Sequence, residues 1–433
     1  MNRVLVVWWE GRPAGELTQD EGGDLGFAYN AAWLGDEGAP AISASLPKRA
    51  GPFSRRECRP FFGGLLPEER QREAAAQALG ISWANDFAML DRLGGDVAGA
   101  LQFLRPGEQP GSPSGPWKPK ALDDKGLLRI LDALPGRPLL AGEKGLRLSL
   151  AGAQSKVPVV LVGGAVALPM PGQPSTHILK PAIPRFEATT ENEAFTMRLA
   201  AAAGLDVAAV EPRIVRSPGG EVRTFLLVER YDRTKATIQG VRRLHQEDFC
   251  QALGVPTERK YQSEGGPSLE DGFALLRRVS ARPAADVLKL LDAVIFNTVV
   301  GNADAHGKNF SILYGSTGPC LAPLYDLLST VIYVELSAKF AMKIGGHARL
   351  EELDAQGWSD FAKKVELGLP FVRRRVGELA ARISEVAPAT FEGLTAIGLD
   401  IAALERLSRL VQKRAQLCTA SLAESRVPKR KHT

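Results

Sequence analysis

The sequence predicts an α+β chain, with a β-rich N-terminal part and an all-α C-terminal part. Short apolar runs separated by glycine, proline and aspartate fill much of the first 230 residues, as is typical of strands and turns. Beyond them, apolar residues recur at helical spacing in four segments: 269–279, 284–300, 371–386 and 399–421. The 433 residues are too many for one ordinary domain, so two or three domains are expected.

The composition fits a globular protein, and 45% hydrophobic residues supply an ample core. The four cysteines are widely scattered and have no metal-ligand spacing, which favours reduced thiols in a cytoplasmic protein. The N-terminal apolar run reaches Glu10 without a signal-peptide cleavage site, and no run of 18 apolar residues predicts a membrane span. A net charge of +5 permits an anionic partner but does not require one.

The first 105 residues combine strands with helices. Strands are predicted at 4–8, 24–29 and 41–46, and a helix at 67–79 by propensity. Residues 87–93 end at a glycine pair that suits a helix C-cap.

Residues 105–119 contain five prolines and three glycines, so they are interpreted as a surface loop or boundary, and a short helix follows at 123–134.

From residue 145 the pattern changes to strands around a small-residue loop. Strands are predicted at 146–150, at 157–162 and 165–168 as a hairpin, at 176–181 and at 224–233, the last of which becomes highly charged toward its end. A helix is predicted from 191 to about 203. The loop of residues 151–156 joins the first strand to the hairpin, and its small side chains let backbone N–H groups approach phosphates.

The polar loop 301–310 carries the strongest signal for chemistry. It lies between an apolar helix-like run and a strand-like run, a position where catalytic residues are common. Asp304 and Asn309 have the D-x-x-x-x-N spacing of protein kinases, and Asp326 follows 17 residues later. These groups supply a base and oxygen ligands for magnesium. The alternative is a polar loop whose Asp and Asn residues only cap helices and form turns.

Weaker signals occur in kinase order before that loop. Lys180 ends an apolar strand, where a lysine either extends to water or binds phosphates and pairs with a helix glutamate, here Glu193. The charged end of the strand at 224–233 is the pattern expected of a hinge, with the backbone of Glu229 and Tyr231 available to an adenine ring.

Taken together, these motifs resemble the HipA family of serine/threonine kinases, the toxins of HipA–HipB toxin–antitoxin modules. The resemblance spans nearly the whole chain, from a segment similar to the family's N-terminal subdomain to the catalytic and metal segments. The stretches that carry it are residues 61–68, 147–156, 176–180, 246–251, 260–267, 302–309 and 324–326.

The resemblance implies a bilobed kinase-like fold that uses ATP and Mg²⁺. Asp304 would be the base or orienting group, Asn309 and Asp326 would bind Mg²⁺, and Lys180 would contact phosphates beside Glu193. Ser149 stands where the family carries a regulatory autophosphorylated serine. The full set of expected nucleotide-binding residues is Ala151, Gly152, Ala153, Gln154, Ser155, Lys156, Lys180, Glu229, Arg230, Tyr231, His306, Gly307, Lys308, Asn309, Tyr325 and Asp326.

The resemblance also implies a domain order. The expected parts are an N-terminal subdomain at 1–105, a linker with a short helix at 106–144, a kinase N-lobe at 145–233, a helical C-lobe at 234–425 and a basic tail at 426–433. None of the candidate groups for ATP chemistry lies before residue 105, so that subdomain is expected to be a partner platform. The tail is interpreted as solvated, with a nucleic-acid contact as the alternative.

The implied partners are a protein substrate, such as an aminoacyl-tRNA synthetase, and a HipB-like helix-turn-helix antitoxin that contributes most of any DNA contact. Growth arrest and persistence would follow from the kinase activity. Ser155 and the His306–Gly307 pair depart from the residues usual in the family, but neither departure removes the base or a metal ligand.

Two other functions remain open from the residues. A small-molecule kinase shares similar Asp and Asn loops, but a small acceptor needs no extra N-terminal subdomain. A non-catalytic corepressor would act by binding a DNA-binding antitoxin, and the intact set of Asp304, Asn309 and Asp326 argues against that as the sole role.

Overall fold

The computed structural model describes residues 2–111, 119–143, 146–217, 219–234 and 240–423. The basic tail at 426–433 and part of the linker at 106–144 therefore lie outside the described residues. The chain forms two compact units, and each unit is built from three separate segments of the sequence. The first unit comprises residues 1–190, 210–258 and 311–322, and the second comprises 191–209, 259–310 and 323–433.

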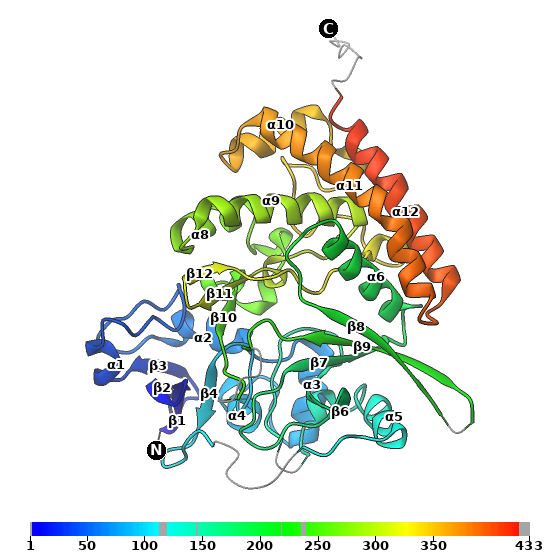
Figure 1. Ribbon diagram of the computed structural model, residues 1–433. Coiled ribbons are helices and arrows are strands. Elements are labelled where there is room, and N and C mark those ends of the chain that lie inside the picture. Colours follow the sequence, from blue (N-terminus) through cyan, green and yellow to red (C-terminus); the bar gives the residue numbers. More distant parts are fainter. Residues whose placement is uncertain (1, 112–118, 144–145, 218, 235–239, 424–433) are drawn as a thin grey trace. The chain divides into compact units, whose positions relative to one another are not determined.

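The first unit contains three antiparallel sheets (Figure 1). A four-stranded sheet has the order β3-β2-β1-β4, a five-stranded sheet has the order β6-β5-β7-β9-β8, and a three-stranded sheet has the order β10-β11-β12. The strands are β1 (Arg3–Trp9), β2 (Arg12–Gln19), β3 (Leu25–Tyr29), β4 (Leu101–Leu104), β5 (Val157–Val162), β6 (Ala165–Ala167), β7 (His177–Pro181), β8 (Val210–Arg216), β9 (Val222–Glu229), β10 (His245–Asp248), β11 (Ser311–Gly315) and β12 (Gly318–Leu321).

Short helices complete the first unit, and several begin at side-chain caps. Ser54 and Glu57 form a capping box at the start of α2, and the Asn85 side chain accepts from Ala88 N at the start of α4. Gly80 ends α3 in the left-handed region at φ 66°, as glycine does without strain. The helices are α1 (Ala31–Gly35), α2 (Arg55–Gly64), α3 (Glu69–Leu79), α4 (Asp86–Leu93), α5 (Asp124–Ala133) and α7 (Phe249–Ala252).

Two hydrophobic cores stabilise the first unit. One lies between the four-stranded sheet and α2 to α4, and it includes Phe27, Phe61, Phe62 and Phe103 at no more than 1% exposure. The other packs α5 against the five-stranded sheet. Leu150, which precedes the loop 151–156, belongs to the first of these cores.

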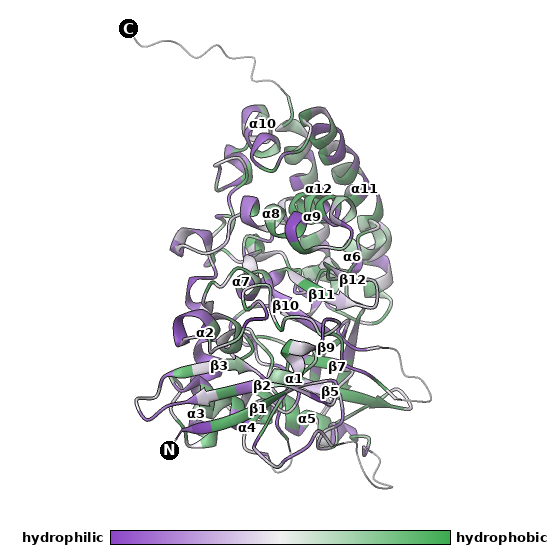
Figure 2. Ribbon diagram, turned by 90° about the vertical axis from the view of Figure 1, so that its left-hand side faces the viewer, coloured by the Kyte–Doolittle hydropathy of each residue, from purple (hydrophilic) through white to green (hydrophobic). Residues whose placement is uncertain are grey.

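The second unit consists of helices, and its described residues contribute no β-strand to a sheet. The apolar helix α9 packs against α8, α11 and α12, and α11 lies beside α12 (Figure 1). Figure 2 colours much of α9 and α12 green, for hydrophobic residues. The mixed α/β first unit and helical second unit confirm the predicted fold class. The helices are α6 (Thr189–Ala202, beginning in the first unit), α8 (Leu269–Val279), α9 (Pro283–Val300), α10 (Ala355–Lys364), α11 (Leu369–Thr395) and α12 (Ile401–Ala420).

Two predicted strands are wrong. Residues 41–46 form only one bridge, between Ser43 and Leu46, because Ser43 and the Ala44 N–H bond the buried Glu247 carboxylate instead of a strand. Residues 146–150 form a single parallel bridge between Leu148 and Asp96. Both segments have the composition of strands, but neither pairs along its length with another strand.

Helix α11 extends beyond its predicted end at residue 386. Pro388 lies inside it, where a proline removes one backbone hydrogen bond and normally ends a helix. Ala387, Thr390 and Leu394 are buried on the helix, and α11 packs along α12. Tertiary packing therefore outweighs the local cost of the proline. Among the described residues, no helix has the length and apolar character needed to cross a membrane.

Candidate active site

The loop that follows α9 is held at its first residue, Gly301. Gly301 ends α9 in the left-handed region at φ 74°, and its carbonyl accepts hydrogen bonds from Thr330 N and Val331 N. A Cβ on Gly301 would overlap the Val331 methyl and lie 3.0 Å from Arg414 Nε. Arg414 on α12 also donates from Nη2 to the Thr298 carbonyl at 2.9 Å, a favourable place for a cation at a helix C-terminus.

Replacing Gly301 by alanine should lower the free energy of unfolding by at least about 2 kcal/mol. A left-handed conformation costs an L-residue about 1–2 kcal/mol, and the overlap with Val331 adds to it. Denaturant unfolding measures the change. Gly393→Ala in α11 is the control, because a Cβ there meets nothing within 4 Å and alanine favours a helix. Equal stability of the two variants would contradict this account of the loop.

Asp304 is held in place by its neighbours while its carboxylate remains exposed. Its N–H donates to Asn302 Oδ1 at 3.2 Å, and the Asn302 side chain in turn donates to Asn297 on α9. Ala303 N donates to Thr330 Oγ1 at 2.8 Å. The Tyr261 hydroxyl donates to Asp304 Oδ1 at 2.7 Å. A carboxylate that is fixed in direction yet open to solvent can accept a proton from a substrate hydroxyl.

The two predicted magnesium ligands lie side by side. Asn309 Nδ2 donates to Asp326 Oδ2 at 3.3 Å, and the Asn309 amide oxygen accepts from His306 N at 3.1 Å. Asp326 has φ 58°, a conformation that non-glycine residues adopt at a cost and that is commonest at functional sites. The Tyr325 hydroxyl donates to the Lys308 carbonyl at 2.7 Å and so joins the two segments.

This donor set fits a magnesium ion that is shared with a nucleotide. Magnesium is usually held by one or two protein oxygens, with phosphates and water completing its octahedron. The carboxylate of Asp326 and the amide oxygen of Asn309 are donors of that kind, although the amide must rotate to turn its oxygen toward Asp326. Among the described residues there is no cluster of three or more His, Cys, Asp or Glu side chains that would hold a metal without phosphates.

The remaining predicted residues of the catalytic loop form one tight turn. Gly307, Lys308 and Asn309 make a short 3₁₀ helix, in which the Asn309 N–H donates to the His306 carbonyl at 2.9 Å. The His306 and Lys308 side chains are buried. The His306 ring meets Tyr261 edge-on with centroids 5.1 Å apart, which supports the tyrosine that bonds Asp304.

The predicted phosphate loop, residues 151–156, belongs to the first unit. Gly152 has φ 112°, a conformation that favours glycine, and its carbonyl accepts from Glu68 N at 3.3 Å. Lys156 Nζ donates to the Ala151 carbonyl at 2.8 Å and so closes the loop on itself. Ser155 Oγ donates to Gln71 on α3 at 3.1 Å, and Gln154 Nε2 donates to Pro181 at 3.3 Å. Ala153 stands between Gly152 and Gln154 in this loop.

Ser149 is completely buried at 0% exposure. Its hydroxyl donates to the Leu65 carbonyl at 2.8 Å, and its N–H donates to the Asp96 carbonyl at 3.0 Å. A kinase can therefore reach this hydroxyl only after the segment has moved away from Leu65 and Asp96.

The other predicted nucleotide-binding residues are divided between the units. Lys180 is buried on β7 of the first unit, and Glu193 is buried on α6 in the second unit, so their ion pair stays a prediction. Glu229 ends β9 and is exposed. The Arg230 side chain is buried among Asp96, Ser175 and Asp232, so this side chain is engaged within the first unit. The Tyr231 hydroxyl bonds Gln246 on β10.

The sequence did not predict the hydrogen bond between the Tyr261 hydroxyl and Asp304. Tyr261 lies in the segment 260–267, which carried a family resemblance but no assigned role. A tyrosine before a Gly-Gly-Pro turn gives no chemical signal by itself, since its use depends on a residue 43 positions away. The tertiary structure alone brings it to Asp304.

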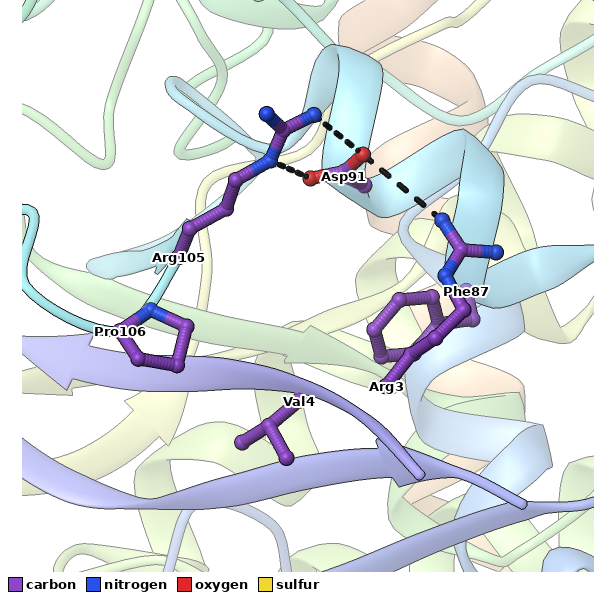
Figure 3. A pocket seen from close by; sticks show the side chains of 6 residues that line it. All are labelled: Arg3, Val4, Phe87, Asp91, Arg105 and Pro106. Atoms are coloured by element: carbon purple, nitrogen blue, oxygen red, sulfur yellow. Dashed lines mark hydrogen bonds and ion pairs between the residues drawn. The ribbon is translucent and has the colours of Figure 1, made fainter. Parts of the chain in front are cut away.

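A small open pocket of about 270 Å³ lies elsewhere in the first unit and contains no predicted site residue. Figure 3 shows Arg105 and Arg3 both directed toward Asp91 on α4, with Phe87 and Pro106 beside them. Arg105 makes two hydrogen bonds of 2.8 Å to Asp91. Burial tends to raise the Asp91 pKa, but the bonds and charge of Arg105 outweigh it and hold the pKa below its ordinary value.

Comparison with known proteins gives the family. Residues 5–104 match the HipA N-terminal domain, and residues 148–390 match the HipA-like C-terminal domain. The putative kinase Y4mE of Sinorhizobium fredii is 63% identical over 422 residues, which cover 97% of this chain and 99% of that protein. The serine/threonine-protein kinase toxin HipA of Shewanella oneidensis is 33% identical over 343 residues, 76% of each chain.

A solved structure gives the same result. The HipA, HipB and operator DNA complex from Shewanella oneidensis MR-1 includes a chain that superposes with a TM-score of 0.82 and 26% identity, covering 95% of this chain and 96% of that one. The fold and these relatives define an enzyme of the kinase class. The chain belongs to the HipA family of serine/threonine-protein kinases, as the resemblance predicted. The exact domain boundaries and the roles of the site residues stay predictions.

Proposed function

We propose that this chain is an ATP- and Mg²⁺-dependent protein kinase that phosphorylates a serine or threonine hydroxyl. The observation that carries the proposal is the arrangement in the second unit: Asn309 and Asp326 lie 3.3 Å apart, and Asp304 is exposed and oriented by Tyr261. Magnesium bound with ATP would neutralise the negative charge that develops during phosphoryl transfer. A magnesium-dependent ATP turnover and autophosphorylation assay on the purified chain tests the proposal.

Each residue has a defined task in this proposal. Asp304 accepts the proton of the substrate hydroxyl or orients that hydroxyl for attack. Asn309 and Asp326 hold the metal, and Tyr325 fixes their segments through Lys308. Lys180, paired with Glu193, and the loop 151–156 bind nucleotide phosphates, and the backbone at Glu229 and Tyr231 receives the adenine.

Replacing Tyr261 by phenylalanine should lower the turnover number about 10-fold and leave nucleotide affinity unchanged. The variant keeps the ring that packs on His306 and removes only the hydroxyl that holds Asp304, and a displaced catalytic group lowers the rate substantially. Steady-state kinetics and nucleotide titration measure the two quantities. An unchanged turnover number would show that Asp304 needs no such support.

The proposed biological role is that of a HipA-type toxin. The solved relative forms a complex with HipB and operator DNA, which supports a HipB-like helix-turn-helix antitoxin as partner, with DNA contacted mainly through that antitoxin. The proposed substrate is a translation-related protein such as an aminoacyl-tRNA synthetase, whose phosphorylation causes growth arrest and persistence. Phosphoproteomics after induction of the wild type and of the Asp304→Asn variant identifies the substrate.

Phosphorylation of Ser149 should switch the kinase off. A phosphoserine adds about −1.5 to −2 charges and strong acceptor oxygens. That group cannot remain at 0% exposure against the acceptor carbonyl of Leu65, so the segment has to move to solvent and the loop 151–156 moves with it.

Intact-mass analysis after incubation with Mg²⁺–ATP tests whether Ser149 is phosphorylated, and nucleotide titration of the phosphorylated form tests whether the phosphate switches the kinase off. Phosphate should appear on Ser149 in the wild type and be absent from the Asp304→Asn variant, and the phosphorylated form should bind nucleotide at least about 10-fold more weakly, a loss of about 1.4 kcal/mol. A phosphorylated form that binds nucleotide as tightly as the unmodified chain rules out the switch.

A further inference from the structure

We propose that Gly95 and Asp96, which form the turn after α4, are positioning residues for nucleotide binding. This 95–96 turn holds the segment that enters the phosphate loop, residues 147–149, and the segment that follows β9, residues 230–233. The inference rests on the proposed function, in which residues 151–156 and 229–231 bind the nucleotide. It assigns the matched HipA N-terminal domain a part in nucleotide binding besides that of a partner platform.

The first support is the backbone pairing on one side of the turn. Asp96 N donates to the Arg147 carbonyl at 2.9 Å, and Ser149 N donates to the Asp96 carbonyl at 3.0 Å, so Leu148 and Asp96 form a parallel bridge. These bonds fix the chain two residues before the loop 151–156. They also help to keep Ser149 buried.

The second support is the close approach that Gly95 allows. A Cβ on this glycine would lie 2.9 Å from both the Cβ and the carbonyl oxygen of Arg147, a distance that would force one of the two segments to move. The absence of a side chain at residue 95 therefore sets how closely the phosphate-loop segment can approach.

The third support is the side chain of Arg147. Its Nη2 donates to the carbonyl of Asp91 on α4 at 2.8 Å and to the carbonyl of Phe103 on β4 at 2.7 Å. The segment is thus attached by side chain as well as by backbone to the residues around the turn.

The fourth support is the ionic network on the other side of Asp96. Its carboxylate accepts from Arg233 Nη2 at 2.9 Å, from Arg243 Nε at 3.0 Å and, at the limit of a hydrogen bond, from Arg230 Nη1 at 3.5 Å. Asp232 bonds Arg230 and Arg233 from the same segment. Burial would raise the Asp96 pKa, but the three arginines outweigh it and hold the pKa far below its ordinary value.

Such a buried network is weak evidence for stability, because desolvation of the ions offsets most of their attraction. It does define one arrangement of its members, since any displaced partner would leave a buried charge unpaired. Ser175, just before β7, also donates its N–H and hydroxyl to Asp96 at 3.1 and 2.6 Å. The 95–96 turn therefore fixes both segments relative to each other within the first unit.

The test compares nucleotide binding of full-length variants by calorimetry with a non-hydrolysable Mg²⁺–ATP analogue. Gly95→Ala should bind the analogue about 10-fold more weakly, since a shift of about 1 Å in a positioned group can cost up to about 100-fold. Gly35→Ala is the matched control, because it lies in the same domain and a Cβ there meets nothing within 4 Å. It should bind like the wild type.

Arg147→Ala provides a second variant if Gly95→Ala does not fold, since the Arg147 side chain is 31% exposed and its loss leaves no large cavity. Its control is Arg12→Ala, which removes an exposed ion pair with Asp36 in the same domain. Hydrogen exchange should be faster at residues 148–152 in Gly95→Ala and Arg147→Ala, and unchanged in both controls.

The outcomes separate this inference from the proposed function. A wild type that binds the analogue, together with variants that bind it equally well and show unchanged exchange at 148–152, overturns the inference and leaves the kinase proposal standing. A wild type that binds no Mg²⁺–nucleotide overturns the proposed function, and this inference with it. Weaker binding in both variants, with both controls unchanged, supports the inference.

Discussion

Replacing Asp304 by asparagine should lower phosphoryl transfer by at least about 100-fold, because a positioned base typically contributes that much or more to the rate. The substitution keeps the side-chain size and the contact with Tyr261, and it removes the negative charge that, in the proposed mechanism, accepts or orients the substrate proton. Because Asp304 is exposed, the folded structure should tolerate the change. Autophosphorylation followed by intact mass measures the loss.

The matched control for this prediction is Asp360→Asn on α10, an aspartate of the same unit that accepts a hydrogen bond from Gln356. Its activity and its unfolding midpoint should equal those of the wild type. Normal turnover in Asp304→Asn would remove this residue from the proposed mechanism and would leave the D-x-x-x-x-N loop without a catalytic base.

Replacing Asp326 by alanine should weaken Mg²⁺–ATP binding by at least about 10-fold, since even the groups that support metal ligands are worth about 10- to 100-fold in metal affinity. The substitution removes the carboxylate that accepts a hydrogen bond from Asn309 Nδ2. Calorimetric titration with ATP in the presence and absence of Mg²⁺ measures the change. The loss should be confined to the titration that contains Mg²⁺.

Backbone strain has to be separated from the loss of the metal ligand. Asp326 is left-handed at φ 58°, a region that asparagine adopts more readily than alanine. Asp326→Asn should therefore fold as well as the wild type and still bind Mg²⁺–ATP more weakly, because it removes the charge alone. Unchanged affinity in Asp326→Asn, with a loss only in Asp326→Ala, would show that Asp326 is a structural turn residue.

The sequence predicted helices α8, α9 and α12 and the hairpin of β5 and β6 well because their signals are local. Residues 269–279 were predicted with the bounds that α8 has, since the apolar spacing starts after Ser268, which caps the helix. The wrong strands at 41–46 and 146–150 have the composition of strands, but their partners are a buried carboxylate and a single bridging residue far along the chain. Such partners are not encoded locally.

In the candidate site, too, local sequence signals were predictive, whereas contacts between distant segments were not. The spacing of Asp304, Asn309 and Asp326 was visible in the sequence, and the structure brings Asn309 to Asp326 and exposes Asp304. The role of Tyr261 and the buried surroundings of Arg230 depend on contacts between distant segments. For Arg230, the charged end of the predicted strand favoured a hinge with a place in nucleotide binding, and the structure shows its side chain buried in a network with Asp96 and Asp232.

The reaction that we propose for this chain is transfer of the γ-phosphoryl group of ATP with a magnesium ion bound at Asn309 and Asp326. The most direct test is incubation of the wild type, Asp304→Asn and Asp326→Asn with ATP labelled in the γ-phosphate, with Mg²⁺ and with a chelator. The account predicts labelled protein only for the wild type with Mg²⁺. Equal labelling of the wild type and both variants, or labelling that persists in the chelator, would contradict it.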